Sequence, residues 1–254
     1  MRRRMISAVA LAALAVAPAG CITLASPPDA VARAAGDPAA AWARVLRAYV
    51  LEDGRIDFVG LRRDPADLAA YVTWLADHGP RTTPARFPTE ASRLAYYINA
   101  YNALAMFQVV VTDRRPEQQI RFFFFTAIAV DGQRLSLYRL EDAVIRPFGD
   151  PRVHFALNCM VRGCPRLPRA PFDSARLDAE LEREARHFLN DPANVQLDPP
   201  LRVVRLNSIL RFWRGDFLAQ APSLVTYANR YRDEPVPEAY AVRFIPYDWT
   251  LRQR

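Results

Sequence analysis

The spacing of apolar residues changes part-way along the chain, and this change limits the folds that the sequence can adopt. Up to about residue 111, apolar residues recur every three or four positions, which is typical of helices packed on a core. Beyond that point, short apolar runs are separated by turn-forming Asp-Gly and Pro residues, which is typical of strands. Helices that come first and strands that come later predict an α+β fold, with N-terminal helices packed on a mainly antiparallel sheet.

Local signals place the helices. The first is predicted over residues 37–51, where Asp37-Pro38 supplies a cap and a first-turn proline. The second begins at Asp64-Pro65, and the third runs from Thr89 to about residue 111. Shorter helices are predicted over residues 136–146, 174–190, 208–214 and 223–232.

The strands are predicted in the second half of the chain. Residues 120–130 form an apolar run typical of a buried strand, and Asp131-Gly132 is a typical hairpin turn into a strand over 133–137. A strand over residues 153–157 would place His154 on the face opposite Val153, because side chains alternate along a strand. The other strands are predicted over residues 195–197, 201–206 and 241–245.

The N-terminus resembles an export signal. Residues 1–20 have a basic start, an apolar stretch too short to span a membrane, and small residues before a cleavage position. Two processing routes remain open. Ala17-Pro18-Ala19 fits ordinary signal peptidase, whereas Ala19-Gly20-Cys21 resembles the end of a lipobox, in which Cys21 is lipidated.

Export determines the expected location and partners. We expect the protein in the periplasm or cell envelope, either free or anchored to the outer membrane through a lipid on Cys21. Residues 21–36, rich in Ala and Pro, form a linker, and residues 37–254 form a single domain of ordinary size. The sequence predicts no other partner.

Composition excludes several classes of protein. All 34 basic residues are arginines, so the chain lacks the lysine of a P-loop, a protein kinase, a pyridoxal-phosphate enzyme or a Schiff-base aldolase. The nine glycines form neither a dinucleotide-binding nor a serine-hydrolase motif. The formal charge of +7 includes three arginines of the signal, and the other arginines are scattered, so we expect no nucleic-acid partner. Because these cofactor-binding motifs are absent from the sequence, we also expect no cofactor.

The segment from Asp150 to Pro165 carries most of the groups capable of chemistry. In an oxidising compartment, Cys159 and Cys164 are expected to form a disulfide. Alternatively, Cys159 is a thiolate nucleophile and His154 its base. Asp248 then either orients the imidazole as the third member of a triad or simply closes a terminal turn. The spacing of these groups matches no zinc motif, so we expect no metal.

Four further residues are candidates for binding. Asn99 and Asn102 lie three residues apart on the third predicted helix, so their amides share a face. They either tie down the backbone of a neighbouring loop or face a ligand, because a buried amide needs partners. Asn158 and Arg162 from the cysteine segment complete this set. Asp216 is interpreted as a surface or loop-tying carboxylate.

Three motifs together resemble the domain of unknown function 547 family. They are Ile98-Asn-Ala-Tyr-Asn-Ala-Leu104, Asp150-Pro-Arg-Val-His-Phe-Ala-Leu-Asn-Cys159 with Gly163-Cys164-Pro165, and Pro246-Tyr-Asp-Trp-Thr-Leu251. The resemblance extends from about Tyr49 to the C-terminus. The family occurs in bacterial exported proteins and, fused to a leucine-zipper segment, in plants. Residues 160–162, Met-Val-Arg, depart from the small or hydroxyl residues of the family at that place.

The resemblance implies that the three motifs belong to one domain, but it implies no catalytic role. Three hypotheses therefore remain open. The first is an exported cell-envelope domain with a polar His/Cys/Asn site of unassigned role. The second is a thiol-dependent hydrolase or acyltransferase that acts on peptide or amide bonds. The third is a non-catalytic module that binds a peptide or glycan.

Overall fold

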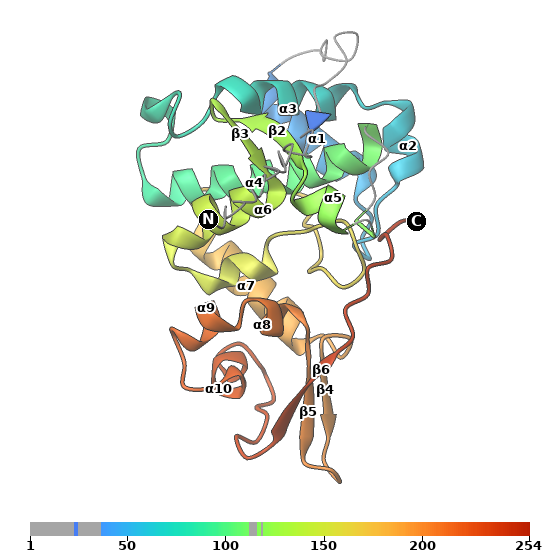
Figure 1. The fold of residues 1–254 in the computed structure, drawn as a ribbon, viewed down its shortest axis with the longest axis vertical. Coiled ribbons are helices and arrows are strands. Elements are labelled where there is room, and N and C mark those ends of the chain that lie inside the picture. Colours follow the sequence, from blue (N-terminus) through green and yellow to red (C-terminus); the bar gives the residue numbers. More distant parts are fainter. Residues whose placement is uncertain (1–22, 25–36, 112–115, 118) are drawn as a thin grey trace, which may run out of the picture.

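The computed structural model describes residues 23–24, 37–111, 116–117 and 119–254. Figure 1 shows the helices of the first half of the chain above, the C-terminal strands and short helices below, and α7 between them. The helices are α1 (Pro38–Tyr49), α2 (Phe58–Arg63), α3 (Ala66–Asp77), α4 (Glu90–Val111), α5 (Gln119–Phe123), α6 (Leu137–Leu140), α7 (Leu177–Asn190), α8 (Ile209–Phe212), α9 (Arg214–Leu218) and α10 (Leu224–Asn229).

The described strands are β1 (Thr23–Leu24), β2 (Thr126–Val130), β3 (Gln133–Ser136), β4 (Val195–Asp198), β5 (Val203–Asn207) and β6 (Ala241–Ile245). They form two sheets, β1-β2-β3 and β4-β5-β6. Each sheet contains one antiparallel hairpin and one parallel pairing, β1 with β2 and β5 with β6. The α+β class is confirmed and is consistent with a single domain. The strands are divided between two small sheets of mixed direction.

The N-terminal helices form where the sequence predicts them. Asp37 caps α1, because its carboxylate accepts a hydrogen bond from the backbone N–H of Ala39 at 3.0 Å. α1 packs on α3 through Trp42 and Tyr71, whose stacked rings have centroids 5.8 Å apart. The three predicted N-terminal helices are thus confirmed as α1, α3 and α4.

α4 is the central helix of the fold. Its 22 residues are long and apolar enough to cross a membrane, but every side chain from Leu94 to Val110 is buried inside the protein. A helix that is buried all round lies in a core, with neighbours on every side. α4 therefore carries the polar side chains of Asn99, Tyr101 and Asn102 into the interior.

The predicted strand over residues 120–130 is wrong in its first half. Helix α5 ends at Phe123, and only Thr126–Val130 forms a strand. Phe124 and Phe125, between the two elements, are about half exposed. A run of four phenylalanines has no alternation that could distinguish a strand from a helix, so periodicity alone gave the wrong answer.

The predicted strand over residues 153–157 is also wrong, and this correction affects the site. Pro151–Phe155 form a 3-10 turn, η4. The Asp150 carboxylate accepts a hydrogen bond from the backbone N–H of Arg152 at 2.9 Å, and the fixed φ of Pro151 suits the first position of a helical turn. These two local preferences outweigh the apparent alternation.

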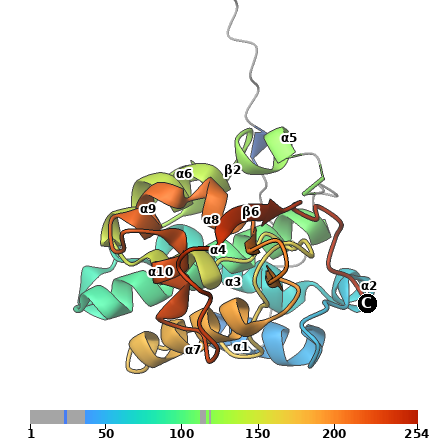
Figure 2. The ribbon, with the colours of Figure 1, turned by 90° about the horizontal axis from the view of Figure 1, so that it is seen from below.

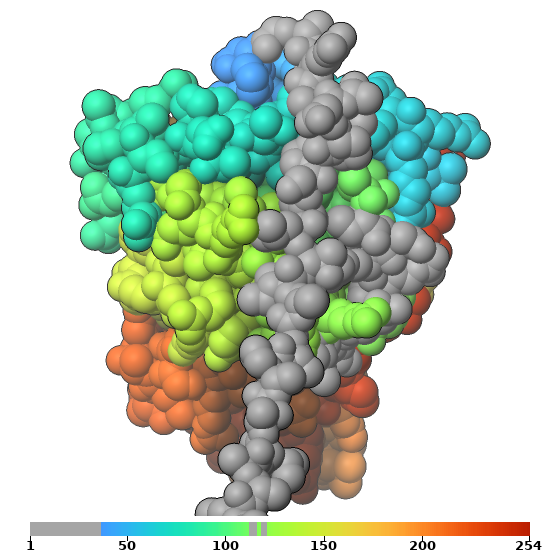
Figure 3. Space-filling view, turned by 45° about the horizontal axis from the view of Figure 1, so that its top comes forward, coloured from blue at the N-terminus to red at the C-terminus, as the bar shows by residue number. Residues whose placement is uncertain are grey.

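Two large clusters of buried apolar residues stabilise the described part of the fold. One surrounds α1, α3 and α4, and the other lies among α7, α8, α9, α10 and the second sheet. Figure 2, viewed from below, shows the C-terminal helices and β6 in front of α3 and α4. In the space-filling view, the yellow-green segment around residues 130–160 lies between the blue-green N-terminal helices above and the orange C-terminal elements below (Figure 3). This segment contributes part of the candidate site, including Glu141 and His154.

Candidate functional site

A cavity of about 240 Å³ lies where the two clusters meet. Its wall is mostly aromatic and apolar, and the charged side chains among the described lining residues are Glu141 and His154. The other lining residues are Tyr101, Phe123, Phe124, Tyr138, Leu157, Cys159, Cys164, Ile209, Phe212, Trp213, Tyr247 and Trp249. Apolar cavities with a few polar groups are the usual form of ligand sites.

His154 lies between two carboxylates. Its side chain is only 1% exposed, and Nε2 lies 2.9 Å from Oδ2 of Asp216 on α9. An ionised carboxylate can only accept, so Nε2–H donates this hydrogen bond. On the other side of the ring, Nδ1 lies 3.4 Å from Oε1 of Glu141, within ion-pair range but too far for a well-formed hydrogen bond. Both imidazole nitrogens therefore face acidic groups.

These neighbours change the titration of His154 and Asp216. Burial by itself lowers the pKa of the imidazole, but the carboxylates of Asp216 and Glu141 outweigh it and hold the pKa of His154 above its ordinary value. Hydrogen bonds from Arg146, and then from His154, hold the pKa of Asp216 far below its usual range. The arrangement thus favours an imidazolium ion beside the ionised carboxylate of Asp216.

Arg146 completes this charged chain from its outer end. Its guanidinium donates two hydrogen bonds to Asp216, at 2.8 Å from Nε and 2.7 Å from Nη2, and it also pairs with Asp142. It lies over one face of Trp213, 4.6 Å from the ring centroid, and His154 stacks on Trp213 at 5.0 Å. Trp213 is therefore held in place by two cationic groups.

Glu141 brings a carboxylate to the wall of the cavity from the π-helical turn η2 (Glu141–Ile145). Its side chain is only 10% exposed. Burial and the adjacent Glu141 carboxylate raise the pKa of Tyr101 well above its ordinary value. Tyr101 therefore stays neutral and keeps its hydroxyl proton beside this acid.

The cysteine loop, residues 159–164, forms another part of the wall. Cys159 and Cys164 lie at disulfide distance, with Cα atoms 6.2 Å apart, which supports the predicted pair. The Tyr247 hydroxyl lies 3.4 Å from the sulfur of Cys159 and 3.2 Å from that of Cys164. A Cβ at Gly163 would come within 2.9 Å of the Tyr247 ring, so only glycine permits this packing.

The predicted binding asparagines contact backbone. Asn102 donates to the carbonyl of Ala156 at 3.0 Å and accepts from the N–H of Asn158 at 2.7 Å. Asn158 donates in turn to the carbonyl of Pro165 at 2.6 Å. Asn99 forms the same pair of bonds with the backbone of Phe172, in a different loop. None of the three asparagines is among the described residues that line the cavity.

Asp248 closes a turn, which is one of the two roles predicted for it, and does not orient His154. It is exposed, and its carboxylate accepts from the N–H of Thr250 at 2.9 Å, which closes a turn. Among the described residues, the carboxylates in ion-pair range of His154 are Glu141 and Asp216. Arg162 is exposed, and its backbone joins the C-terminal segment: its N–H donates to the Thr250 carbonyl, and its carbonyl accepts from the Arg252 guanidinium at 2.7 Å.

Sequence reasoning missed Glu141 and misassigned Asp216. Glu141 follows Leu137 by four residues, so it lies on the inward face of that helical segment, and this spacing was an available signal. Asp216 follows a short aromatic helix, and nothing local distinguishes it from a surface carboxylate. Only the tertiary fold brings it to His154.

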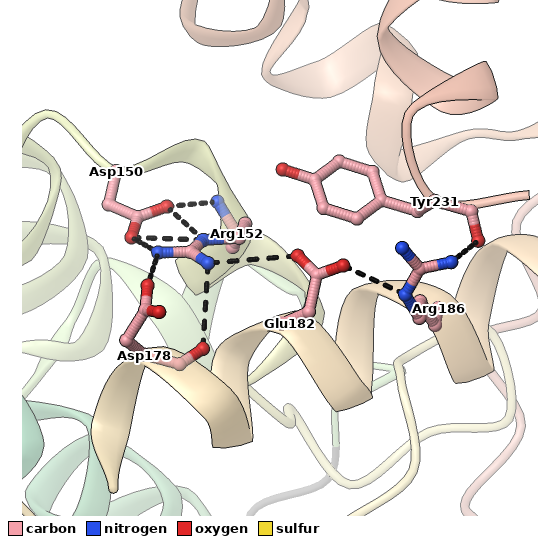
Figure 4. Close-up of polar contacts among 6 residues, drawn as sticks. All are labelled: Asp150, Arg152, Asp178, Glu182, Arg186 and Tyr231. Atoms are coloured by element: carbon pink, nitrogen blue, oxygen red, sulfur yellow. Dashed lines mark hydrogen bonds and ion pairs between the residues drawn. The ribbon is translucent and has the colours of Figure 1, made fainter.

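A network of ion pairs holds the turn that carries His154 against α7 (Figure 4). Arg152 donates to Asp150 at 2.8 Å and to Asp178, in the first turn of α7, at 2.7 Å. Glu182, one turn further along α7, approaches the same guanidinium at 3.8 Å and pairs with Arg186 at 2.8 Å. η4 is thus fixed at its start, next to His154.

In the part of the chain that the structure describes, no group of three or more His, Cys, Asp or Glu side chains is arranged to hold a metal ion. Searches of curated proteins and of solved structures found no match. Residues 85–189 match the model of the family described as "Protein of unknown function, DUF547". The part of the chain that contains α4, the histidine turn and the cysteine loop therefore resembles the DUF547 family.

Proposed function

We propose that this chain is an exported cell-envelope protein whose domain binds an organic ligand in the aromatic cavity. The observation that carries the proposal is the cavity wall, in which eight aromatic side chains surround one carboxylate and one imidazole. Flat apolar faces bury a compact apolar group, and the few polar groups fix its orientation.

The composition of the wall favours a peptide or small molecule over a glycan. Several rings pack edge to face, and their contacts hold the wall together. The ring centroids of Tyr247 and Trp249 are 4.6 Å apart, and those of Phe212 and Tyr247 are 5.2 Å apart. A sugar presents many hydroxyl groups, and each needs a partner when it leaves water. The lining supplies few such partners, whereas it complements an apolar side chain well.

The geometry gives less support to a thiol-dependent hydrolase. A cysteine nucleophile needs a free thiolate and a base directed at it. Cys159 is paired with Cys164, and the imidazole nitrogens of His154 face Asp216 and Glu141. We therefore expect unreduced mature protein to leave both cysteines unlabelled by iodoacetamide. Rapid labelling of Cys159 would instead support the hydrolase.

Export and anchoring belong to the same proposal. The signal in residues 1–20 and Cys21 lie outside the described residues, and their sequence pattern alone supports the prediction. Thr23 and Leu24, which follow Cys21 closely, pair with Thr126 and Ala127 of β2. A lipid on Cys21 would thus hold the domain close to the membrane surface.

Ligand binding can be tested through the tryptophans in the cavity wall. Acetylated tripeptides with a central Leu, Met or Phe, and chitotriose as the glycan, are titrated against the mature chain by tryptophan fluorescence and calorimetry. We expect at least one peptide to bind, and Trp249→Leu to weaken it about tenfold by removing one aromatic contact. Leu201→Ala, at an exposed position outside the cavity, should leave binding unchanged. Preference for chitotriose, or an unchanged affinity in Trp249→Leu, would contradict the proposal.

A further inference from the structure

The ion pairs around the cavity leave the charged cluster short of one positive charge. Glu141, Asp142 and Asp216 are linked through Arg146 and His154, so three carboxylates are balanced by two cations even when the imidazole is protonated. Glu141 is the carboxylate of this cluster that lines the cavity. A ligand with a single positive charge would complete the balance.

The aromatic wall also favours a positively charged ligand. The π faces of Tyr, Phe and Trp carry negative electrostatic potential and attract cations, most strongly where water is excluded. Phe124 with Tyr138, and Tyr247 with Trp249, present such rings in contact around the cavity, with centroids 4.6 Å apart in each pair. An anionic ligand would meet both these faces and the Glu141 carboxylate, and would be repelled.

The scarcity of hydrogen-bond acceptors narrows the kind of cation. A primary ammonium group has three N–H donors, and each must find an acceptor when it leaves water. Glu141 already has His154 on one side and Tyr101 on another. A fully methylated ammonium group needs no acceptor, and its methyl groups are complementary to an apolar wall.

From this charge balance and this wall, we infer that the ligand of the cavity carries a quaternary ammonium group, held by the Glu141 carboxylate and by the surrounding aromatic faces. The inference rests on the proposed binding function and specifies the chemical class of its ligand. Free choline-type molecules and peptides with trimethyl-lysine present this same group.

The test compares isosteric probes. Choline, its uncharged isostere 3,3-dimethyl-1-butanol and the primary amine ethanolamine are titrated against the mature chain by calorimetry. We expect choline to bind about tenfold more tightly than the uncharged isostere, in line with a desolvated cation–π site, and more tightly than ethanolamine. An acetylated tripeptide with a central trimethyl-lysine distinguishes the sources: tighter binding than choline indicates a peptide, and weaker binding a small molecule.

Variants locate the charge preference. Glu141→Gln should abolish the preference for choline while the uncharged isostere binds as before, and Trp249→Leu should weaken choline more than the isostere. Glu234→Gln, at an exposed position outside the cavity lining, is the matched control and should retain the preference. If Glu141→Gln does not fold, the comparison of choline with its isostere in the wild type and in Trp249→Leu still tests whether the cavity prefers the quaternary ammonium group.

The outcomes separate the inference from the proposed function. Equal binding of choline and its isostere, or tighter binding of ethanolamine, overturns the quaternary ammonium and leaves the binding cavity intact. Binding of the apolar tripeptides without binding of choline likewise overturns the quaternary ammonium and leaves the binding cavity intact. If no probe of either series binds, both proposals fail.

Discussion

Removal of the Asn102 amide tests whether α4 serves to hold the cysteine loop. Asn102 is 1% exposed and bonds on both sides of Leu157, to the carbonyl of Ala156 and the N–H of Asn158. Asn102→Ala leaves these two backbone groups unpaired in the interior. A buried unpaired group costs about 1–3 kcal/mol, so we expect the free energy of unfolding to fall by about 3 kcal/mol. For a chain of this size, that corresponds to a melting temperature lower by about 6–12 °C.

The matched control is Asn99→Ala. Asn99 makes the same pair of bonds from the same helix, but to the backbone of Phe172 instead of the cysteine loop. We expect a similar loss of stability in urea unfolding followed by tryptophan fluorescence. The two variants should differ in the rate at which dithiothreitol reduces Cys159–Cys164, because only Asn102 holds the backbone that leads into this loop.

One result would refute the reasoning about Asn102. If Asn102→Ala costs less than about 1 kcal/mol and leaves the reduction rate unchanged, the amide does not hold the loop. If the variant keeps its stability and its reduction rate but loses binding of the cavity probes, Asn102 contacts the ligand directly. The candidate binding role of this residue would then replace the positioning role.

Three further predictions follow from the charges, the packing and the N-terminus. Asp216 and Glu141 raise the pKa of folded His154 above its ordinary value of 6.5. The stability that His154 adds is therefore complete below about pH 6.5 and decreases as the pH rises through the folded pKa. In urea unfolding, the difference in free energy between wild type and His154→Gln should decrease over the same pH range. Gly163→Ala should cost about 1–3 kcal/mol in urea unfolding by displacing Tyr247, whereas Gly215→Ala, with open space around its Cβ, should stabilise α9. Cys21→Ser should abolish incorporation of labelled palmitate, and unchanged incorporation would exclude Cys21 as the lipidated residue.

Much of the fold could be predicted because its signals are local. Asp37 before Pro38 marks the start of α1, and Asp131-Gly132 forms a hairpin turn with φ angles of 50° and 71°, in the left-handed region that these residues tolerate. The hairpin β4–β5 and the strand β6 were placed by the same kind of turn residue and short apolar run. Each of these features depends on a few neighbouring residues.

The candidate site was only partly predictable because its contacts are distant in sequence. His154 and the two cysteines were identified from an unusual segment, and the structure places all three in the cavity wall. Asp216, the partner of His154, lies 62 residues away, so no spacing rule connects them. The turn that Asp248 closes is local and was predicted, whereas its alternative role in a triad rested on an analogy that takes no account of the distance between the groups.

The 3-10 turn explains how one short segment can serve both cores and the cavity. With three residues per turn, consecutive side chains leave the axis in directions about 120° apart. Val153 thus joins the cluster around α4, Phe155 joins the cluster around α7, and His154 faces Glu141 and Asp216 between them. A strand would have sent Val153 and Phe155 to the same face, and one of the two cores would have lost its contact. The turn therefore positions the imidazole by packing on both sides of it.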